Sequence, residues 1–309
     1  EDAIRLNEQF NKSIESYHKT KIKCFSVGEE IKLSNEANQL FNDLCEKFNL
    51  KDYLKERFLC FTQTVELFFS NKNVKSFLYF SNSKNSKMDL GGENPFRTFF
   101  SQMNDLYAEN AEFYFLSGAN ETFERKKQKM FECLKEGKKV FAVTSYWSMG
   151  AGQNVHYEFN SKFDSDLVQV NSFEYNDAHK DFDAIYLETP TNILVNTAKG
   201  FDSDEEFIKY IYQLKFLQEV GEIDTAKVEV RIKDAFLLKN GSSHKNHPHP
   251  KESRHFNMAY AKVAMQAIGR ICRTRNKQKT IFVLYQKSFA DRIKPIIPYF
   301  SDKFVNPEF

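Results

Sequence analysis

Short apolar runs alternate with longer amphipathic stretches along much of the chain. The short runs predict buried β-strands, and the stretches between them repeat their apolar positions every three or four residues, as helices do. Strands that alternate with helices form parallel sheets with helices on both faces, so the sequence predicts an α/β protein. The predicted strands are residues 76–83, 112–116, 140–144, 183–188 and 281–285, with helices at 94–110 and 121–136.

The first part of the chain has no comparable strand-like run and is predicted to be helical. Apolar residues recur at helical spacing after Ser34, whose side chain suits a helix N-cap. A further helix is predicted over residues 50–70, leading into the first predicted strand. We therefore divide the chain into a helical segment, residues 1–73, and an α/β domain, residues 74–309.

Residues 196–254 depart from the alternation of strands and helices and are predicted to be an insertion. Ser203 is a suitable N-cap for a helix over residues 204–219, whereas the alternating pattern of residues 228–232 indicates a half-exposed strand. A polar loop with several histidines follows. Histidines can bind zinc, but no cysteine or carboxylate has a matching spacing, so a solvent-exposed loop is the better interpretation and no metal site is predicted. These histidines are His244, His247 and His249.

Composition narrows the class of protein. The net charge of the 309 residues is only +2, so any contact with nucleic acid must come from a local basic patch. No apolar run approaches the length of a bilayer span, and no membrane association is predicted. The five cysteines are odd in number and lack metal-type spacing, which favours reduced thiols. We therefore expect a cytoplasmic protein.

Two segments of the predicted α/β domain contain residues suited to phosphate binding. The loop after strand 140–144 contains Gly150 and Gly152, and glycines at alternate positions let the backbone approach a ligand closely. The second segment contains Arg270 and Arg273, which are three residues apart and are expected to share one helix face. Guanidinium groups so placed can bind a nucleotide phosphate, although an exposed basic helix without a ligand has the same pattern.

In order and spacing, these segments resemble motifs of the superfamily-2 helicases and translocases. The strand that ends in Thr144, with the Gly-x-Gly-x-Asn loop that ends at Asn154, resembles motif V. The pattern Gln-x-x-Gly-Arg-x-x-Arg at residues 266–273 resembles motif VI, and residues 76–83 resemble motif IV. The resemblance covers about residues 74–309 and implies a RecA-like fold, the second of the two RecA-like domains in that family.

The resemblance also implies a nucleotide and partners. Such motors hold ATP between two RecA-like domains, and the first domain supplies a phosphate-binding loop and an acidic residue for Mg²⁺. This chain contains no Gly-x-x-x-x-Gly-Lys-Ser/Thr pattern. We therefore expect it to be the C-terminal motor half of an ATP-dependent nucleic-acid helicase or translocase and to be inactive alone. ATP and Mg²⁺ would be held mainly by an N-terminal RecA-like ATPase domain of the same polypeptide, to which the helical N-terminal segment would lead.

Roles for individual residues follow from the resemblance. Arg273 is expected to be the arginine finger, Arg270 to share the γ-phosphate contact, and Gln266 to help fix the nucleotide-dependent arrangement. For Ser81 and Asn82, hydrogen bonding within a turn is an equally good interpretation. The residues expected to lie at the nucleotide are Gly150, Gly152, Asn154 and Gly269, and those expected to contact nucleic acid are Ser81, Asn82 and Thr144.

Two further expectations can be tested by a structure or by assay. Many family members have Asp where this chain has Asn154, and this difference favours movement along double-stranded nucleic acid without strand separation. The assigned roles also require that the end of the late basic helix and the glycine-bearing loop lie at the same edge of one sheet. An alternative function is a non-catalytic RecA-like module that binds nucleic acid or a partner protein.

Overall fold

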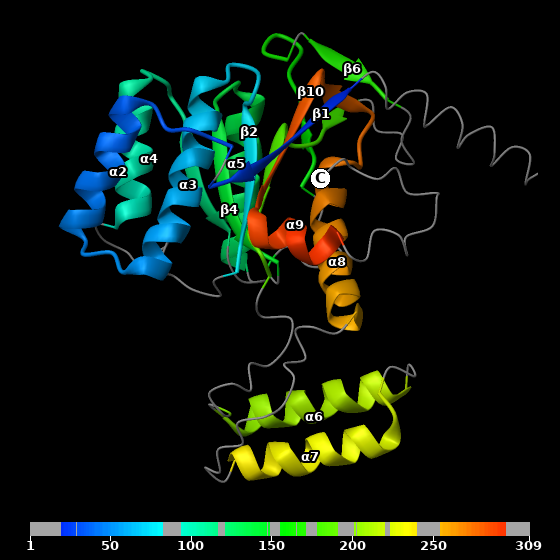
Figure 1. Ribbon diagram of the computed structural model, residues 1–309. Helices are drawn as coiled ribbons and strands as arrows, with labels where there is room; N and C mark the ends of the chain where they lie inside the picture. The colour runs from blue at the N-terminus through cyan, green and yellow to red at the C-terminus, as the bar shows by residue number, and fades with distance from the viewer. Residues whose placement is uncertain are drawn as a thin grey trace, which may run out of the picture. The chain divides into compact units, whose positions relative to one another are not determined.

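A six-stranded, all-parallel sheet forms the centre of the protein (Figure 1). Its strand order is β1-β10-β8-β2-β4-β3. The strands are β1 (Lys21–Val27), β2 (Ser76–Ser81), β3 (Glu112–Leu116), β4 (Val140–Ser145), β8 (Ala184–Leu187) and β10 (Thr280–Gln286). The computed structural model describes residues 20–28, 30–82, 94–116, 121–146, 148, 155–164, 166–170, 178–190, 201, 203–219, 223–239 and 254–294.

The strand pairing defines two edges of this sheet. All neighbouring strands are parallel, for example Ser76 beside Val140 and Phe282 beside Ala184. The amino ends of the six strands therefore share one edge, and their carboxyl ends share the other. A helix that connects two parallel neighbours runs back from the carboxyl edge to the amino edge.

Three helices cover one face of the sheet: α2 (Asn35–Lys47), α3 (Asp52–Ser70) and α4 (Pro95–Leu106) (Figure 1). They share a core rich in phenylalanine with alternate residues of the strands. Phe61 lies edge-on to Tyr79 and Phe141, and Phe77 stacks on Phe141 at 4.9 Å between ring centroids. Offset and edge-to-face aromatic pairs of this kind each add about 0.5–1.5 kcal/mol beyond their burial. Many of the chain's phenylalanines thus lie in this core.

The opposite face of the sheet is covered in part by α5 (Glu121–Lys135), whose buried residues Met130 and Leu134 lie outside the phenylalanine core. The remaining strands form a small second sheet with the order β5-β7-β9-β6. Its strands are β5 (Tyr157–Glu158), β6 (Leu167–Gln169), β7 (His179–Lys180) and β9 (Asn276–Gln278). The protein is therefore an α/β protein with a RecA-like parallel sheet and helices on both faces, as predicted.

A second compact unit comprises residues Pro190–Lys262 and Arg292–Phe304, close to the predicted insertion. It contains the helices α6 (Asp204–Glu219) and α7 (Thr225–Lys239), and the boundary between the units falls within the sequence of α8 (Arg254–Ile268). Ser203 caps α6 by accepting the N–H of Glu206 at 3.2 Å, as predicted. The loop with His244, His247 and His249 lies outside the described residues.

Two secondary-structure predictions are wrong. Residues Lys21–Val27 form the edge strand β1 and pair with β10, although the N-terminal segment was expected to be helical. Helices α2 and α3 share their core with β2. Residues 228–232 belong to α7, so their alternating pattern did not indicate a strand. The predicted helices at 50–70, 94–110 and 121–136 are confirmed.

No helix in the described part of the chain combines the length and the apolarity that crossing a membrane requires.

Candidate functional site at the amino edge of the sheet

The segment with Arg270 and Arg273 lies at the amino edge of the large sheet. Helix α8 ends at Ile268, and a 3₁₀ turn (Gly269–Ile271) and a bend lead into β9 and β10. Arg270 lies in the turn, whereas Arg273 lies beyond it. The prediction that the two arginines share one helix face is therefore wrong, because the α-helix stops before either of them.

The two arginines differ in exposure. Arg270 is buried, with 2% of its surface exposed, whereas Arg273 is half-buried. Burial, and then the positive charge of Arg273, lower the pKa of the Arg270 guanidinium. Like charges brought together in a partly desolvated site repel one another, and an anion bound between them reduces that repulsion. Gln266 is exposed on the last turn of α8.

Gly269 has open space beside it. A Cβ atom added there meets no heavy atom within 4 Å in the described structure. The place of Gly269 at a nucleotide stays a prediction.

Asp181 holds the backbone of the arginine segment. Its Oδ2 atom accepts the N–H groups of Arg273 and Thr274, both at 2.8 Å. The same oxygen forms an ion pair with Lys277, whose ammonium group also donates to the carbonyl of Ile271 at 3.1 Å. Asp181 precedes β8 by three residues, which places this contact at the amino edge.

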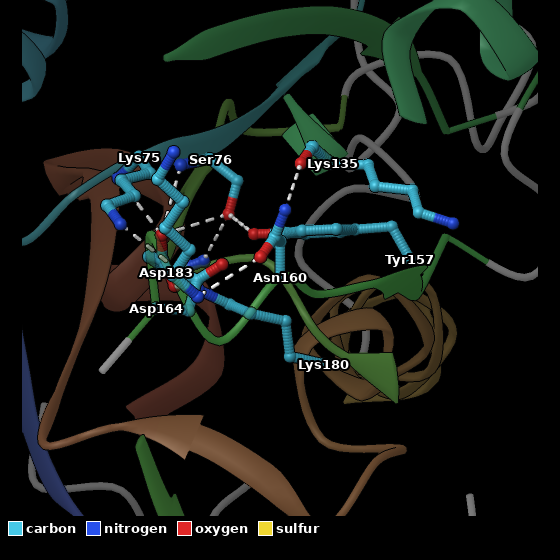
Figure 2. A network of polar contacts seen from close by, with 9 residues as sticks. Lys75, Ser76, Lys135, Tyr157, Asn160, Asp164, Lys180 and Asp183 are labelled. Atoms are coloured by element: carbon cyan, nitrogen blue, oxygen red, sulfur yellow. Dashed lines mark hydrogen bonds and ion pairs between the residues drawn. The ribbon is translucent and has the colours of Figure 1, made fainter. Parts of the chain in front are cut away.

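A second set of buried charges is centred on Lys180, the residue before Asp181 in the sequence (Figure 2). Lys180 is completely buried, and its Nζ atom lies 2.8 Å from Asp183 and 3.1 Å from Asp164. Burial alone lowers the pKa of Lys180, but the Asp183 and Asp164 carboxylates outweigh it and raise that pKa. Asp183 also accepts the N–H groups of Lys75 and Ser76, at 2.9 and 3.0 Å. These contacts join the start of β8 to the start of β2.

The residues expected to contact nucleic acid lie at the carboxyl edge. There Glu188, just after β8, accepts from Arg57 at 2.6 Å and from the Asn82 N–H at 2.7 Å. The Ser81 hydroxyl accepts from Arg57 at 2.8 Å, and the Asn82 side-chain amide donates to the Thr189 carbonyl. Ser81 and Asn82 therefore make long-range hydrogen bonds, to α3 and to the residues just after β8. Whether they also contact nucleic acid stays a prediction.

This carboxyl edge has the topology of a ligand crevice. From β2 the chain continues to β3 on one side of the sheet, and from β8 it continues to β10 on the other side. Ligands of open α/β sheets commonly bind where neighbouring strands diverge in this way. A pocket of about 380 Å³ lies nearby at the ends of β1 and β10, lined among others by Gly28, Glu56 and Gln286.

Thr144 and the start of the glycine-bearing loop are also at the carboxyl edge. The Thr144 hydroxyl is buried and donates to the Leu116 carbonyl at 3.1 Å, so it joins β4 to β3. The Tyr146 hydroxyl donates to the Glu188 carbonyl at 2.7 Å. The residues Gly150, Gly152 and Asn154 lie outside the described part of the chain.

The arginine segment and the start of the glycine-bearing loop thus lie at opposite edges of the sheet. The expectation that they share one edge is wrong for the described residues. The physical reason is the direction of the crossover. Helix α8 is the last α-helix before β9 and β10, so its last residues arrive at the amino ends of the strands, whereas a loop that follows β4 begins at the carboxyl end.

Sequence reasoning did not identify Arg57, Asp181, Lys180 and Glu188. One signal was available. Lys180, Asp181 and Asp183 directly precede a buried strand, where unpaired charges are costly. Their partners could not be read from the sequence, because Arg57 and Glu188 are 131 residues apart.

The described residues contain no group of three or more His, Cys, Asp or Glu side chains that could hold a metal ion. No model of a known protein family matches the chain, and no curated protein is significantly similar to it. What the site can do is therefore argued from its geometry.

Proposed function

We propose that the chain is the C-terminal motor domain of an ATP-dependent nucleic-acid helicase or translocase. The observation that carries this proposal is the pair Arg270 and Arg273, brought together at one edge of a RecA-like sheet on an anchored backbone. The order of the sequence motifs along the chain supports it. The described residues do not meet the requirement of a shared edge, so the proposal rests on the arginine segment, and a contact of the glycine-bearing loop with the nucleotide is not part of it. In the proposed motor, a first RecA-like domain of the same polypeptide holds ATP and Mg²⁺ against this edge.

Arg273 has the central role in this proposal. When water attacks the γ-phosphorus, the bond to the bridging oxygen breaks and ADP leaves with the bonding electrons. Negative charge on the phosphoryl oxygens is redistributed in the transition state, and a guanidinium group aimed at them stabilises it. Arg273 is the more accessible of the two arginines, so we assign it this contact and assign Arg270 a supporting one.

The nucleic-acid track is proposed for the opposite, carboxyl edge. Ser81 and Asn82 lie there at the point where β2 and β8 diverge. Their polar groups bond within the chain in this structure, so binding of a phosphate backbone requires exchange of the contacts with Arg57 and Thr189. In this proposal, the nucleotide is contacted at the amino edge of the sheet, and the nucleic-acid strand is bound at the carboxyl edge.

The test is nucleic-acid-stimulated ATP hydrolysis by the polypeptide that carries this chain and its first RecA-like domain. Arg273→Ala is expected to lower kcat by about 10³-fold or more, because arginine fingers contribute about 10³ to 10⁵ in turnover. The KM for ATP is expected to change little, since the lost contact forms chiefly in the transition state.

The matched control is Lys279→Ala. Lys279 is a basic residue six positions along the same segment, with 66% of its side chain exposed. Its removal is expected to leave turnover unchanged. If Arg273→Ala hydrolyses ATP as fast as the unaltered polypeptide, the motor assignment of this segment is wrong.

A non-catalytic RecA-like module is the second candidate, favoured by a specific observation. Ser81, Asn82 and Thr144 all use their polar groups within the chain. Nucleic-acid or protein binding by this chain with an affinity that neither nucleotide nor Arg273→Ala changes would favour the module over the motor.

A further inference from the structure

We propose that Asp181 is a positioning residue that acts through Arg273. Together with Lys277 it forms a clasp, the Asp181–Lys277 clasp, on the backbone from Ile271 to Thr274. This inference rests on the proposed function, because it assigns Asp181 a part in the same reaction.

The clasp fixes the backbone from which the Arg273 side chain departs. Two consecutive N–H groups, those of Arg273 and Thr274, converge on a single carboxylate oxygen at 2.8 Å each. On the other side, the ammonium group of Lys277 holds the Ile271 carbonyl. A peptide segment bonded at both its donors and its acceptor has little freedom to rotate, so the direction of the Arg273 Cα–Cβ bond is set by the clasp.

The electrostatic surroundings strengthen these bonds. Asp181 and Lys277 have only 1% and 3% of their side chains exposed, so water screens their attraction weakly. Hydrogen bonds to an ionised acceptor are also about twice as strong as neutral ones. The second Asp181 oxygen, Oδ1, is buried without a hydrogen-bond partner among the described residues, so the bonding is concentrated on the oxygen that faces Arg273 and Thr274.

The clasp also separates the roles of the two arginines. Arg270 precedes the clasped backbone and is buried in the 3₁₀ turn, whereas Arg273 lies within it and is half-buried. Asp181 in turn lies two residues before Asp183, which anchors the first residues of β2 through the Lys75 and Ser76 N–H groups. The segment Lys180 to Asp183 therefore ties Arg273 rigidly to the sheet.

The experiment is a double-mutant cycle on nucleic-acid-stimulated ATP hydrolysis, with Asp181→Asn and Arg273→Ala singly and combined. Asp181→Asn is expected to lower kcat by about 10²-fold, the effect of misplacing a reacting group by about 1 Å, with little change in the KM for ATP. In the Arg273→Ala background the same substitution is expected to cause little further loss, because the residue it positions is already absent. A merely structural Asp181 would lower turnover by the same factor in both backgrounds.

A matched control is Asp166→Asn. This carboxylate, 74% exposed, pairs at 3.7 Å with Lys279, which lies beyond the clasped backbone. It is expected to leave kcat unchanged. If Asp181→Asn does not fold, Asp181→Glu replaces it. This substitution keeps the negative charge for Lys277 but displaces the carboxylate oxygen from the Arg273 and Thr274 N–H groups, and the same double-mutant cycle then tests the positioning role.

An independent measurement uses this chain alone. Amide hydrogen exchange at Arg273 and Thr274 is expected to speed up on Asp181→Asn and to stay unchanged on Asp166→Asn. Unchanged exchange, or additive losses in the cycle, would overturn the clasp while leaving the motor proposal standing. An inactive Asp181→Asn beside a fully active Arg273→Ala would instead overturn the motor role of Arg273.

Discussion

At the scale of single residues, the described structure holds its buried charges in pairs and small clusters. Lys180 lies between Asp164 and Asp183, Arg57 forks onto Glu188, and Asp181 meets Lys277. The Arg57–Glu188 and Asp181–Lys277 pairs join segments that are far apart in the chain. Removing one partner of such a pair leaves an unpaired charge buried away from water. This lowers the free energy of unfolding far more than the loss of an exposed ion pair does.

Lys180→Met tests this difference. It leaves Asp164 and Asp183 buried without their shared cation, so the free energy of unfolding is expected to fall by about 3–5 kcal/mol. The control is Lys135→Met, which breaks an ion pair with Glu158 whose partners are 54% and 53% exposed, for an expected change of at most about 1 kcal/mol. Denaturant unfolding at neutral pH measures both. Equal losses from the two variants would show that the buried cluster has no special role.

At the scale of elements, local signals in the sequence set several of the described helix starts. Ser34 accepts the N–H of Ala37 at the start of α2, and Asn94 accepts the N–H of Arg97 at the start of α4. Pro95 follows Asn94 at the first position of α4, where a missing N–H costs nothing. The long-range pairs named above then fix where each element lies in the sheet.

Asn94→Ala tests the cap of α4. Loss of the side-chain acceptor is expected to lower the free energy of unfolding by about 1 kcal/mol, the usual effect of removing an N-cap. Asn73→Ala, at an exposed turn residue, is expected to change it by less than about 0.5 kcal/mol. A stability of Asn94→Ala equal to that of the unaltered chain would contradict the capping role.

The elements that could be predicted are those whose pattern is local. Buried runs such as residues 140–144 show their strand character directly. Strand β1 was missed because it is an edge strand, with Lys21 and Lys23 exposed, and its pattern resembles a polar surface. The alternation at residues 228–232 was misread because a five-residue window fits a strand as well as part of a helix.

The candidate site was predictable only in part, for a related reason. The motif-like residues could be found by their spacing, but Asp181 and Arg273 are 92 residues apart and their contact depends on the fold. The prediction of the edge on which the arginines lie was wrong, because a motif gives the order of residues along the chain and not the direction in which a crossover helix runs.

At the scale of the whole molecule, the RecA-like sheet presents two distinct edges. Arg270, Arg273 and Asp181 lie at the amino edge, while Ser81 and Asn82 lie at the carboxyl edge. Strands β2 and β8 run side by side from the amino edge to the carboxyl edge. Asp183 joins their ends at the amino edge, and Glu188 joins them at the carboxyl edge. In the proposed motor, this rigid pair of strands couples the nucleotide to the nucleic acid.

The central claim is that Arg273 stabilises charge that develops during ATP hydrolysis. The most direct measurement is the affinity of the two-domain polypeptide, with nucleic acid bound, for ADP alone and for ADP with aluminium fluoride, which mimics the transferring phosphoryl group. The account predicts that the unaltered polypeptide and Lys279→Ala bind the mimic at least about 10²-fold more tightly than ADP. Arg273→Ala is predicted to bind ADP normally and to lose most of that preference; an undiminished preference in Arg273→Ala would contradict the account.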